Sequence, residues 1–549
     1  MRYCVVLCLG WAMAFGFIPQ SFRLQSTAGI WDDDYDLMFD PARILEIEGY
    51  RLWTNLSNYA TGNDEQFGPG RSNLFLVGGS TGKDWQVAPA GIFDHYQFER
   101  PLFTGLFGPD ERDSLFGRGR SSYAEWRDLD SNGTYDFKRV MITERNAWRR
   151  GSGDDCYFGV GTELGAARVG AGFIWENGKV EFTNPEFDYI LHNYDSSLIA
   201  GRLTWLHDDT GKFRQFSGSD AKRLVLSGWF KLGETWELGA MLKPGFITTD
   251  DRLERTEKSR TDFNPGVGSP TDYEQSSLDE WWKSPYSGFD LPLTVQLVLR
   301  NDAYETWWSL GGFYASQRLG SDGGGRSVAT YHRTLNPGYT TEWDTMIHNR
   351  AGARSGSGLN LGLVRRHHLA EKLEFGFGVN LGLGFGVDSL LDELQEWERV
   401  VYDNGDSLQN VFDYTRTTTS AETWLERTTA SQAKAAVPVG LEFRPITPVA
   451  LRLGALPTFL WENVTTTHQL LALAPRKSRT EYGDGSFSER VDEVERSPDS
   501  RERRTSFTQT TQLTYGAGFR PVENLQIDLM GFANLVDLTG WRLSATLRF

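Results

Sequence analysis

Cysteines and long apolar stretches are scarce in this chain of 549 residues. Of its three cysteines, Cys4 and Cys8 lie in an N-terminal stretch that we expect to be removed, so Cys156 has no partner for an intrachain disulfide. Beyond residue 18, no apolar run reaches the length that a membrane-spanning helix requires. The sequence therefore excludes intrachain disulfides in the mature chain and, beyond its first residues, membrane-spanning helices.

Basic clusters and familiar catalytic motifs are lacking as well. The chain has 56 basic and 73 acidic residues, a formal net charge of −17, and no lysine or arginine cluster of the kind that binds nucleic acid. It has no H-E-x-x-H zinc motif and no C-x-x-C pair. Histidines near the expected strands, such as His192, have no serine-rich surroundings that would indicate a hydrolase. We therefore expect neither an enzyme nor a nucleic-acid-binding protein.

The N-terminus has the organisation of a secretory signal. Met1 and Arg2 precede an apolar run over residues 3–18, and small residues follow at 26–28, where a signal peptidase reads its site. We expect residues 1–28 to be a signal peptide. The alternative, an uncleaved anchor helix, is disfavoured because the run is short for a bilayer and contains glycine.

Aromatic residues and glycines are plentiful, and in the second half of the chain apolar and polar side chains alternate. Over residues 373–385, seven apolar residues occupy every second position, which is long for a soluble strand and fits a tilted membrane strand. The last nine residues, 541–549, alternate in the same way. A closed barrel in a membrane requires this pattern, because its apolar side chains face lipid and its polar ones face a wet lumen.

Short and long connections alternate between these strands. Outer-membrane barrels have short periplasmic turns and long external loops, so we expect the two Arg-Pro turns at 444–445 and 520–521, and the C-terminus, on the periplasmic side. We predict an all-β fold, a closed antiparallel transmembrane β-barrel over residues 51–549 with about 14 to 18 strands, about 16 being favoured. Long external loops are expected at 99–156, 248–289, 318–356, 387–430 and 462–505.

Charged residues on the inward face are expected to line the lumen and to influence what passes. The register across the turn at Pro445 places Glu442 opposite Arg452, within reach of a salt bridge. The alternative is that such charges brace and hydrate the interior without selecting a ligand. The candidates for lumen-lining charges are Glu374, Glu442, Arg452, Asp528 and Arg542.

The stretch from Asp128 to Asp136 has the beginning of a calcium loop. Oxygen-bearing side chains alternate along it and Gly133 stands at the bend, but Arg139 occupies the position of the bidentate glutamate of an EF-hand. A looser calcium site in an external loop is one hypothesis, and a plain Asx-rich turn is the other. The calcium ligands would be Asp128, Asp130, Asn132 and Asp136.

Both ends of the chain resemble bacterial outer-membrane barrels. The C-terminal strand resembles the signal that the assembly machinery of that membrane recognises, with Trp541, Leu547 and Phe549. The segment after the expected signal peptide resembles the N-terminal segment of the FadL/PorV superfamily, and the matching residues are Asp32, Asp33, Leu37, Pro41, Ala42 and Ile44. Asp40 and Arg43 depart from that pattern. The resemblance implies that residues 29–50 form a hatch inside the lumen; the alternative is a short capped helix on a surface.

The resemblance also implies a function. We expect passive movement of small compounds, hydrophobic ones included, across the outer membrane, with displacement of the hatch as the gate. The expected partners are outer-membrane lipid, the assembly machinery and a small-molecule ligand. No cofactor is required, apart from calcium under the hypothesis of a calcium site in the external loop. The alternatives are a barrel that serves as a platform for secretion or surface attachment, and a soluble β-rich enzyme that would need no detergent.

Overall fold

The computed structural model describes residues 21–549 except 56–73, 82–86, 102–117, 129–130, 132–133, 147, 184–187, 199–201, 264–271, 334–337, 407, 410, 494–498 and 533–541. Three short helical segments precede the first strand: α2 (Phe22–Ser26), α3 (Asp34–Leu37) and η1 (Ile44–Glu46). None of the helices in the described ranges is long and apolar enough to cross a membrane.

The rest of the described chain is almost entirely strand. The strands are β1 (Gly49–Asn55), β2 (Leu74–Thr81), β3 (Val87–Pro101), β4 (Arg118–Arg127), β5 (Phe137–Asn146), β6 (Trp148–Leu164), β7 (Ala167–Phe182), β8 (Tyr189–Ser197), β9 (Arg202–Lys231), β10 (Trp236–Leu242), β11 (Gly245–Phe263), β12 (Asp272–Arg300), β13 (Tyr304–Arg333), β14 (Gly338–Ala370), β15 (Leu373–Asp403), β16 (Tyr414–Ala436), β17 (Val439–Ile446), β18 (Val449–Leu473), β19 (Arg476–Tyr482), β20 (Phe487–Asp492), β21 (Ser500–Val522), β22 (Leu525–Phe532) and β23 (Arg542–Arg548).

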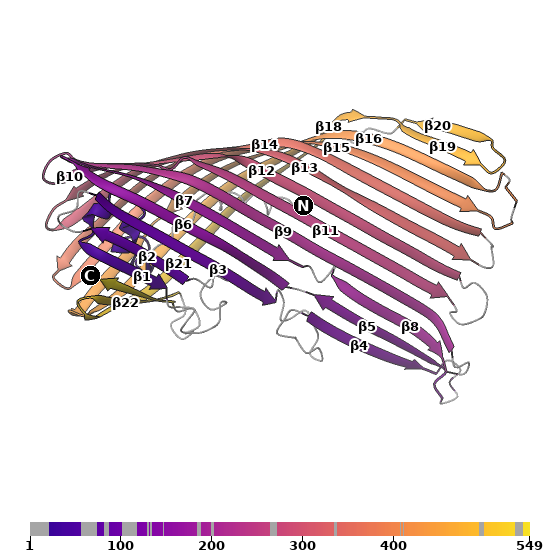
Figure 1. Ribbon diagram of the computed structural model, residues 1–549, viewed down its shortest axis with the longest axis horizontal. Helices are drawn as coiled ribbons and strands as arrows, with labels where there is room; N and C mark the ends of the chain where they lie inside the picture. The colour runs from indigo at the N-terminus through magenta and orange to yellow at the C-terminus, as the bar shows by residue number, and fades with distance from the viewer. Residues whose placement is uncertain are drawn as a thin grey trace.

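All these strands belong to one antiparallel sheet, and the sheet closes on itself (Figure 1). At the closure, β1 pairs with β2 on one side and with β23 on the other. From β2 the pairings continue through β3, β6, β7, β9, β10, β12, β13, β14, β15, β17, β18, β21 and β22 back to β23. Closure leaves no strand edge in this ring to face lipid.

The described residues contain 23 strand segments, more than the predicted number of about 14 to 18, although the closed ring itself passes through sixteen of these segments. The difference arises because many strand courses are broken into two collinear pieces that share the same neighbours. Pro244 separates β10 from β11, and Pro438 separates β16 from β17. Proline has no N–H to donate to the ladder, so it interrupts the strand without ending its course.

Several strands continue far into segments that the sequence predicted to be loops. β12, β13, β14 and β15 have 29, 30, 33 and 31 residues, about 100 Å at ~3.3 Å per residue. They form the long wall that extends away from the short turns and the C-terminus in Figure 1. We call residues 272–288, 316–333, 338–355 and 387–403 of these strands the projecting wall.

The predicted loops at 248–289, 318–356, 387–430 and 462–505 are thus largely strand, as are the described parts of 99–156. The prediction of loops failed because it relied on alternation between apolar and polar residues. A strand with water on both faces needs no such alternation, so its sequence resembles that of a polar loop.

An apolar belt surrounds the outside of the ring. In β15, Phe377, Leu381 and Phe385 are 39, 49 and 57% exposed, whereas the glycines between them face inward and are mostly buried. On β15 the belt covers residues 375–385, about 36 Å along the strand, or about 25 Å across a bilayer for a strand tilted by about 45°. This is the height of the apolar band of a membrane barrel, and the fold is a transmembrane β-barrel.

Candidate functional site

Residues 21–48, which we call the lumenal segment, fold into short helical turns joined by capped bends. Ser21 caps α2 by accepting a hydrogen bond from Leu24 N at 3.0 Å, and Asp33 and Asp36 form a capping box at α3. Asp36 also accepts hydrogen bonds from the amide of Ser21 at 2.8 Å and from its hydroxyl at 2.5 Å. The carboxylate of Asp36 therefore joins the first helix to the second.

The lumenal segment lies inside the ring, against inward-facing side chains of many strands. Its apolar residues pack into a cluster with residues of β1, β3, β6, β7 and β9. The buried members are Tyr35, Met38, Phe39, Ile44, Ile47, Trp53, Ala88, Ala90, Ile92, Tyr157, Ile174 and Val225. Burying each large apolar side chain contributes roughly 1.5 to 3 kcal/mol, so this cluster is a main source of the segment's attachment to the wall.

Inward-facing glycines receive the backbone of the lumenal segment at two places. At each place a side chain on the strand would collide with the segment, because its backbone or, at Gly376, the side chain of Ile30 approaches too closely for a β-carbon. Successive register partners across neighbouring strands form each group. The groups are Gly376, Gly440 and Gly454, which face residues 26–31, and Gly161 and Gly170, which face Pro41.

Acids of the lumenal segment face arginines that project from the strands. Arg366 of β14 makes the most bonds: it donates to Ile30 O at 2.6 Å and to Asp32 at 2.8 Å, and to Glu305 of the neighbouring strand at 3.1 Å. Similar pairs hold the segment on other sides of the ring. They join Asp34 to Arg51 of β1 and Glu46 to Arg168 of β7.

A second ion network surrounds Glu442, which is 1% exposed. Glu442 accepts hydrogen bonds from Arg452 at 3.0 Å, as the register predicted, and from Arg23 of the lumenal segment at 2.9 Å. Arg452 also donates to Asp528 at 2.6 Å. A buried carboxylate is costly without such partners, so Arg23 both attaches the segment and stabilises the charge of Glu442.

The charges of the lumenal segment respond to this environment. Burial disfavours the charged form of Asp32, but Arg366 and Arg43 outweigh it and hold the pKa of Asp32 below its ordinary value. Burial is opposed in the same way at Glu46, where Arg43 is the main cause of a lowered pKa. At Asp36 burial is the dominant influence, and it raises the pKa to about 7.

The structure brings most of the predicted lumen charges together. Glu374 lies 3.8 Å from Arg23 and joins the network of Glu442, Arg452 and Asp528. Arg542 begins β23, and its side chain lies outside the described part of the structure.

The residues predicted for the hatch all lie in the lumenal segment. Ala42 N donates to Ser227 at 2.9 Å and Asp33 accepts from Gln526 at 3.4 Å. Pro41 lies against Gly161 and Gly170, Leu37 packs against the apolar cluster, and Asp32 accepts from Arg366. The structure differs from the predicted bounds of 29–50, since contacts with the wall begin at Ser21 and β1 begins at Gly49. Movement of the segment and the removal of residues 1–28 stay predictions. Cleavage after residue 28 would remove Ser21 and Arg23, so their contacts belong to the uncleaved chain, whereas the pairs of Asp32, Asp34 and Glu46 are present with or without cleavage.

Two other predictions fall partly outside the described residues. For the calcium loop, Asp128 and Asp136 are described, but Asp130 and Asn132 are not. For the assembly signal, Trp541 is not described, whereas Leu547 and Phe549 are 38 and 69% exposed on the outside of the barrel. Both stay predictions.

No pattern in the sequence indicates several of the contact residues. Arg23 lies within the expected signal peptide, and Arg366 lies near the end of β14 in no motif that distinguishes it from other arginines. The glycine groups carried a usable signal, because Gly376 and Gly440 occupy positions whose neighbours on the strand are apolar and outward. A glycine at an inward position indicates that something approaches the strand there.

The fold and this site define a transmembrane barrel with a packed segment in its lumen. No family model matches the chain, and no curated protein matches it. Solved structures similar to it include the toluene transporter TbuX of Ralstonia pickettii, with 12% identity over 98% of this chain and 100% of that one and a TM-score of 0.31. The toluene transporter TodX of P. putida has 10% identity over 96% and 98%, with a TM-score of 0.24.

A FadL homologue of Pseudomonas aeruginosa has 10% identity over 97% of this chain and 99% of that one, with a TM-score of 0.21. A FadL homologue and two toluene transporters are thus among the similar structures. Likenesses at these identities and TM-scores carry no argument about function, which has to come from the geometry of the lumen.

Proposed function

We propose that the protein passively transports small compounds across the bacterial outer membrane and that the lumenal segment is its gate. The observation that carries this proposal is the attachment of residues 21–48 to strands on several sides of the ring. A segment held across a lumen by separate side-chain pairs can be released without breaking the strand ladder. Such a segment is a gate rather than a part of the wall.

The chemistry of the interface supports a class of ligand. Apolar residues of the segment, such as Met38 and Phe39, cover apolar residues of the wall, such as Ile92 and Ile174. A small compound with an apolar body would compete for the same surface, since the hydrophobic effect does not depend on which apolar group covers it. The ion pairs join single side chains of the segment to separate strands, so they would break one at a time once the apolar contacts are replaced.

The test uses the full-length protein in planar bilayers, with Arg366→Gln as the gate variant. This change removes the bonds to Ile30, Asp32 and Glu305, and we expect single-channel or leak conductance to rise about tenfold, as for a loss of ~1.4 kcal/mol of attachment. The matched control is Arg354→Gln. Arg354 is also inward-facing on β14, but it bonds to Asp388 of the wall at 3.2 Å.

Uptake of an apolar fluorescent compound into proteoliposomes gives the second measurement. We expect Arg366→Gln to raise the rate of uptake and Arg354→Gln to leave it near that of the unmodified protein. Equal conductance and uptake in all three proteins, each shown to be folded by its migration on an unboiled gel, would overturn the gate and with it the transport proposal.

A second candidate function, a platform for surface attachment, is favoured by the projecting wall. Strands of about 100 Å extend well beyond the roughly 30 Å core of a bilayer, and transport across that core does not require them. Shortening the β13–β14 and β15–β16 hairpins by equal numbers of residues separates the two functions. Unchanged conductance would give the wall a role of its own, and altered conductance would make it part of the transport route.

A further inference from the structure

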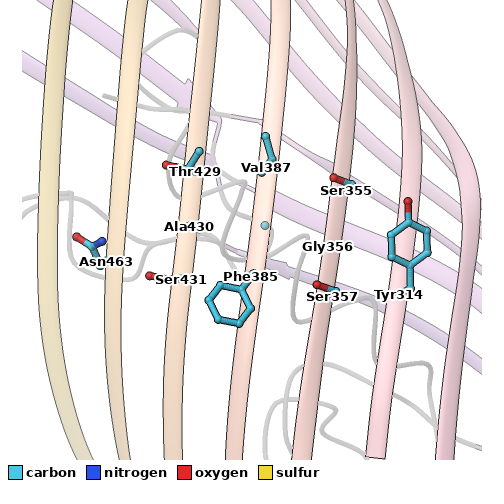
Figure 2. A pocket seen from close by; sticks show the side chains of 11 residues that line it. Tyr314, Ser355, Gly356, Ser357, Phe385, Val387, Thr429, Ala430, Ser431 and Asn463 are labelled. Atoms are coloured by element: carbon cyan, nitrogen blue, oxygen red, sulfur yellow. The ribbon is translucent and has the colours of Figure 1, made fainter.

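A polar depression of about 320 Å³ lies on the outer face of the barrel, where the apolar belt ends. Figure 2 shows it from close by, with side chains contributed by five neighbouring strands, β13, β14, β15, β16 and β18. The exposed ring of Phe385 establishes that this is the lipid-facing side. The labelled residues that line it include Tyr314, Ser355, Ser357, Thr429, Ser431 and Asn463.

The register explains why hydroxyl groups gather here. Tyr314, Ser357, Phe385, Ser431 and Asn463 are successive partners across the five strands, so they form one row on the same face. The next row on this face, farther along the strands from the belt, contains Ser355 and Thr429 on either side of Val387. Together these rows form a wide surface of small hydrogen-bonding groups, with the ring of Phe385 at its centre and that of Tyr314 at one end.

An apolar depression of about 440 Å³ lies two rows nearer the short turns. It is within the belt, and its lining has the width and chemistry of a groove for hydrocarbon chains. Gly312 of β13 lies between this depression and the polar one and has no side chain. At β13, therefore, no side chain separates the two depressions. Its lining side chains include Leu297, Trp308, Leu310, Leu361, Leu363 and Leu381.

Three arginines border the polar depression on its far side. Arg318 and Arg427 belong to the row beyond Ser355 and Thr429, and Arg503 of β21 donates to Asn463 in the depression at 2.9 Å. All three are exposed, and within the described ranges no carboxylate forms an ion pair with any of them. Other outward arginines, such as Arg252 and Arg260, are paired with an aspartate two residues away.

We propose that this outer face binds an acylated, phosphorylated saccharide lipid of the surrounding leaflet. Along the strands from the belt toward the projecting wall, this face offers three surfaces in turn. They are an apolar groove for acyl chains, hydroxyl and amide groups for a saccharide, and arginines without an ion-pair partner in the described chain for phosphate. A membrane lipid of this class presents the same three parts in the same order. The proposal is independent of the lumen and of transport.

The width of the site favours a saccharide over a simple phospholipid. Arg318 and Arg427 lie three strands apart in one row, roughly 14 Å at ~4.8 Å per strand. A single glycerophosphate headgroup does not span that separation, whereas a disaccharide with a phosphate at each end does. The hydroxyl rows on the belt side of the arginines then face the sugar rings.

The test measures binding of a fluorescent diphosphorylated, acylated disaccharide to the full-length protein in detergent micelles. We expect the triple variant Arg318→Gln, Arg427→Gln, Arg503→Gln to bind at least about tenfold more weakly, because it loses the charged hydrogen bonds that the arginines would make to phosphate. The matched control, Arg252→Gln, Arg260→Gln, Lys283→Gln, removes three outward cations elsewhere and should change affinity less than about twofold.

Three further arms identify the source of the ligand chemistry. The dephosphorylated disaccharide lipid and phosphatidylglycerol should bind much more weakly to the unmodified protein, and inorganic phosphate should not displace the probe. Ser357→Leu with Ser431→Leu should weaken the saccharide lipid but not phosphatidylglycerol. The proposal is overturned if the two triple variants behave alike, if phosphatidylglycerol binds as tightly as the disaccharide, or if inorganic phosphate competes fully.

Discussion

The apolar belt and the projecting wall are consecutive parts of the same strands, but they differ in how their sequences are organised. In β15, the belt alternates Phe377 and Leu381 with glycines, whereas the wall has acids on both faces, Asp392 inward and Glu393 outward by their register. The pairing is continuous through both parts. The comparison shows that alternation reports a difference between the solvents on the two faces and not the presence of a strand.

The largest expected effect is on stability, and it is tested by replacing leucine with arginine once in the belt and once in the projecting wall. Leu381→Arg places a charge in the lipid-facing belt and should destabilise the barrel by about 2 to 4 kcal/mol, as charged residues do near a bilayer midplane. Leu391→Arg places it on the same face of β15, beyond the belt, where water solvates the guanidinium, and should cost less than about 0.5 kcal/mol. Reversible unfolding by denaturant in liposomes measures both.

An equal loss of stability in the two variants would contradict the comparison. It would mean either that the belt does not face lipid or that the wall is covered by another molecule. A loss confined to Leu391→Arg would reverse the assignment of the two parts.

The sequence was sufficient to predict strands whose two faces meet different solvents. It was insufficient to predict strands that have water on both faces. It predicted the closed barrel, the outward position of Phe377 and the pairing of Glu442 with Arg452, because each follows from a period of two and a short turn. It did not predict the strands of the projecting wall, whose two faces are both polar. The position of Arg23 beside Glu442 joins residues 419 apart, and no local pattern indicates such a contact.

Two glycines, one facing the lumenal segment and one in the projecting wall, test the same comparison. At Gly161 of β6 an added β-carbon would collide with the backbone of Pro41, whereas at Gly320 in the projecting wall it would meet nothing within 4 Å. We expect Gly161→Ala to displace the segment and to raise leak conductance about tenfold, for an overpacking cost of ~1 to 3 kcal/mol. Gly320→Ala should leave conductance unchanged.

Stable, folded Gly161→Ala protein with unaltered conductance would show that the segment can shift without opening the lumen. Gel migration without boiling separates this result from misfolding, since the barrel of a misfolded variant would not migrate as a compact form.

The smallest effect concerns the pH dependence of the gate. Burial raises the pKa of Asp36 to about 7, so the docked segment favours its protonated form, and the contribution of Asp36 to docking is greatest in acid and is lost as the pH rises through about 7. The lowered pKa values of Asp32 and Glu46 have the opposite sign, and their contributions are lost only in more acidic solution. Between pH 5.5 and 8.5, a range of about 3 units, we expect leak conductance to rise by up to about tenfold as Asp36 loses its proton.

Asp36→Asn should remove most of this rise, whereas Asp388→Asn, which lies in the wall against Arg354, should preserve it. A pH response that survives in Asp36→Asn would assign the gate's proton to another group and leave the attachment of the segment to its arginines and its apolar cluster alone.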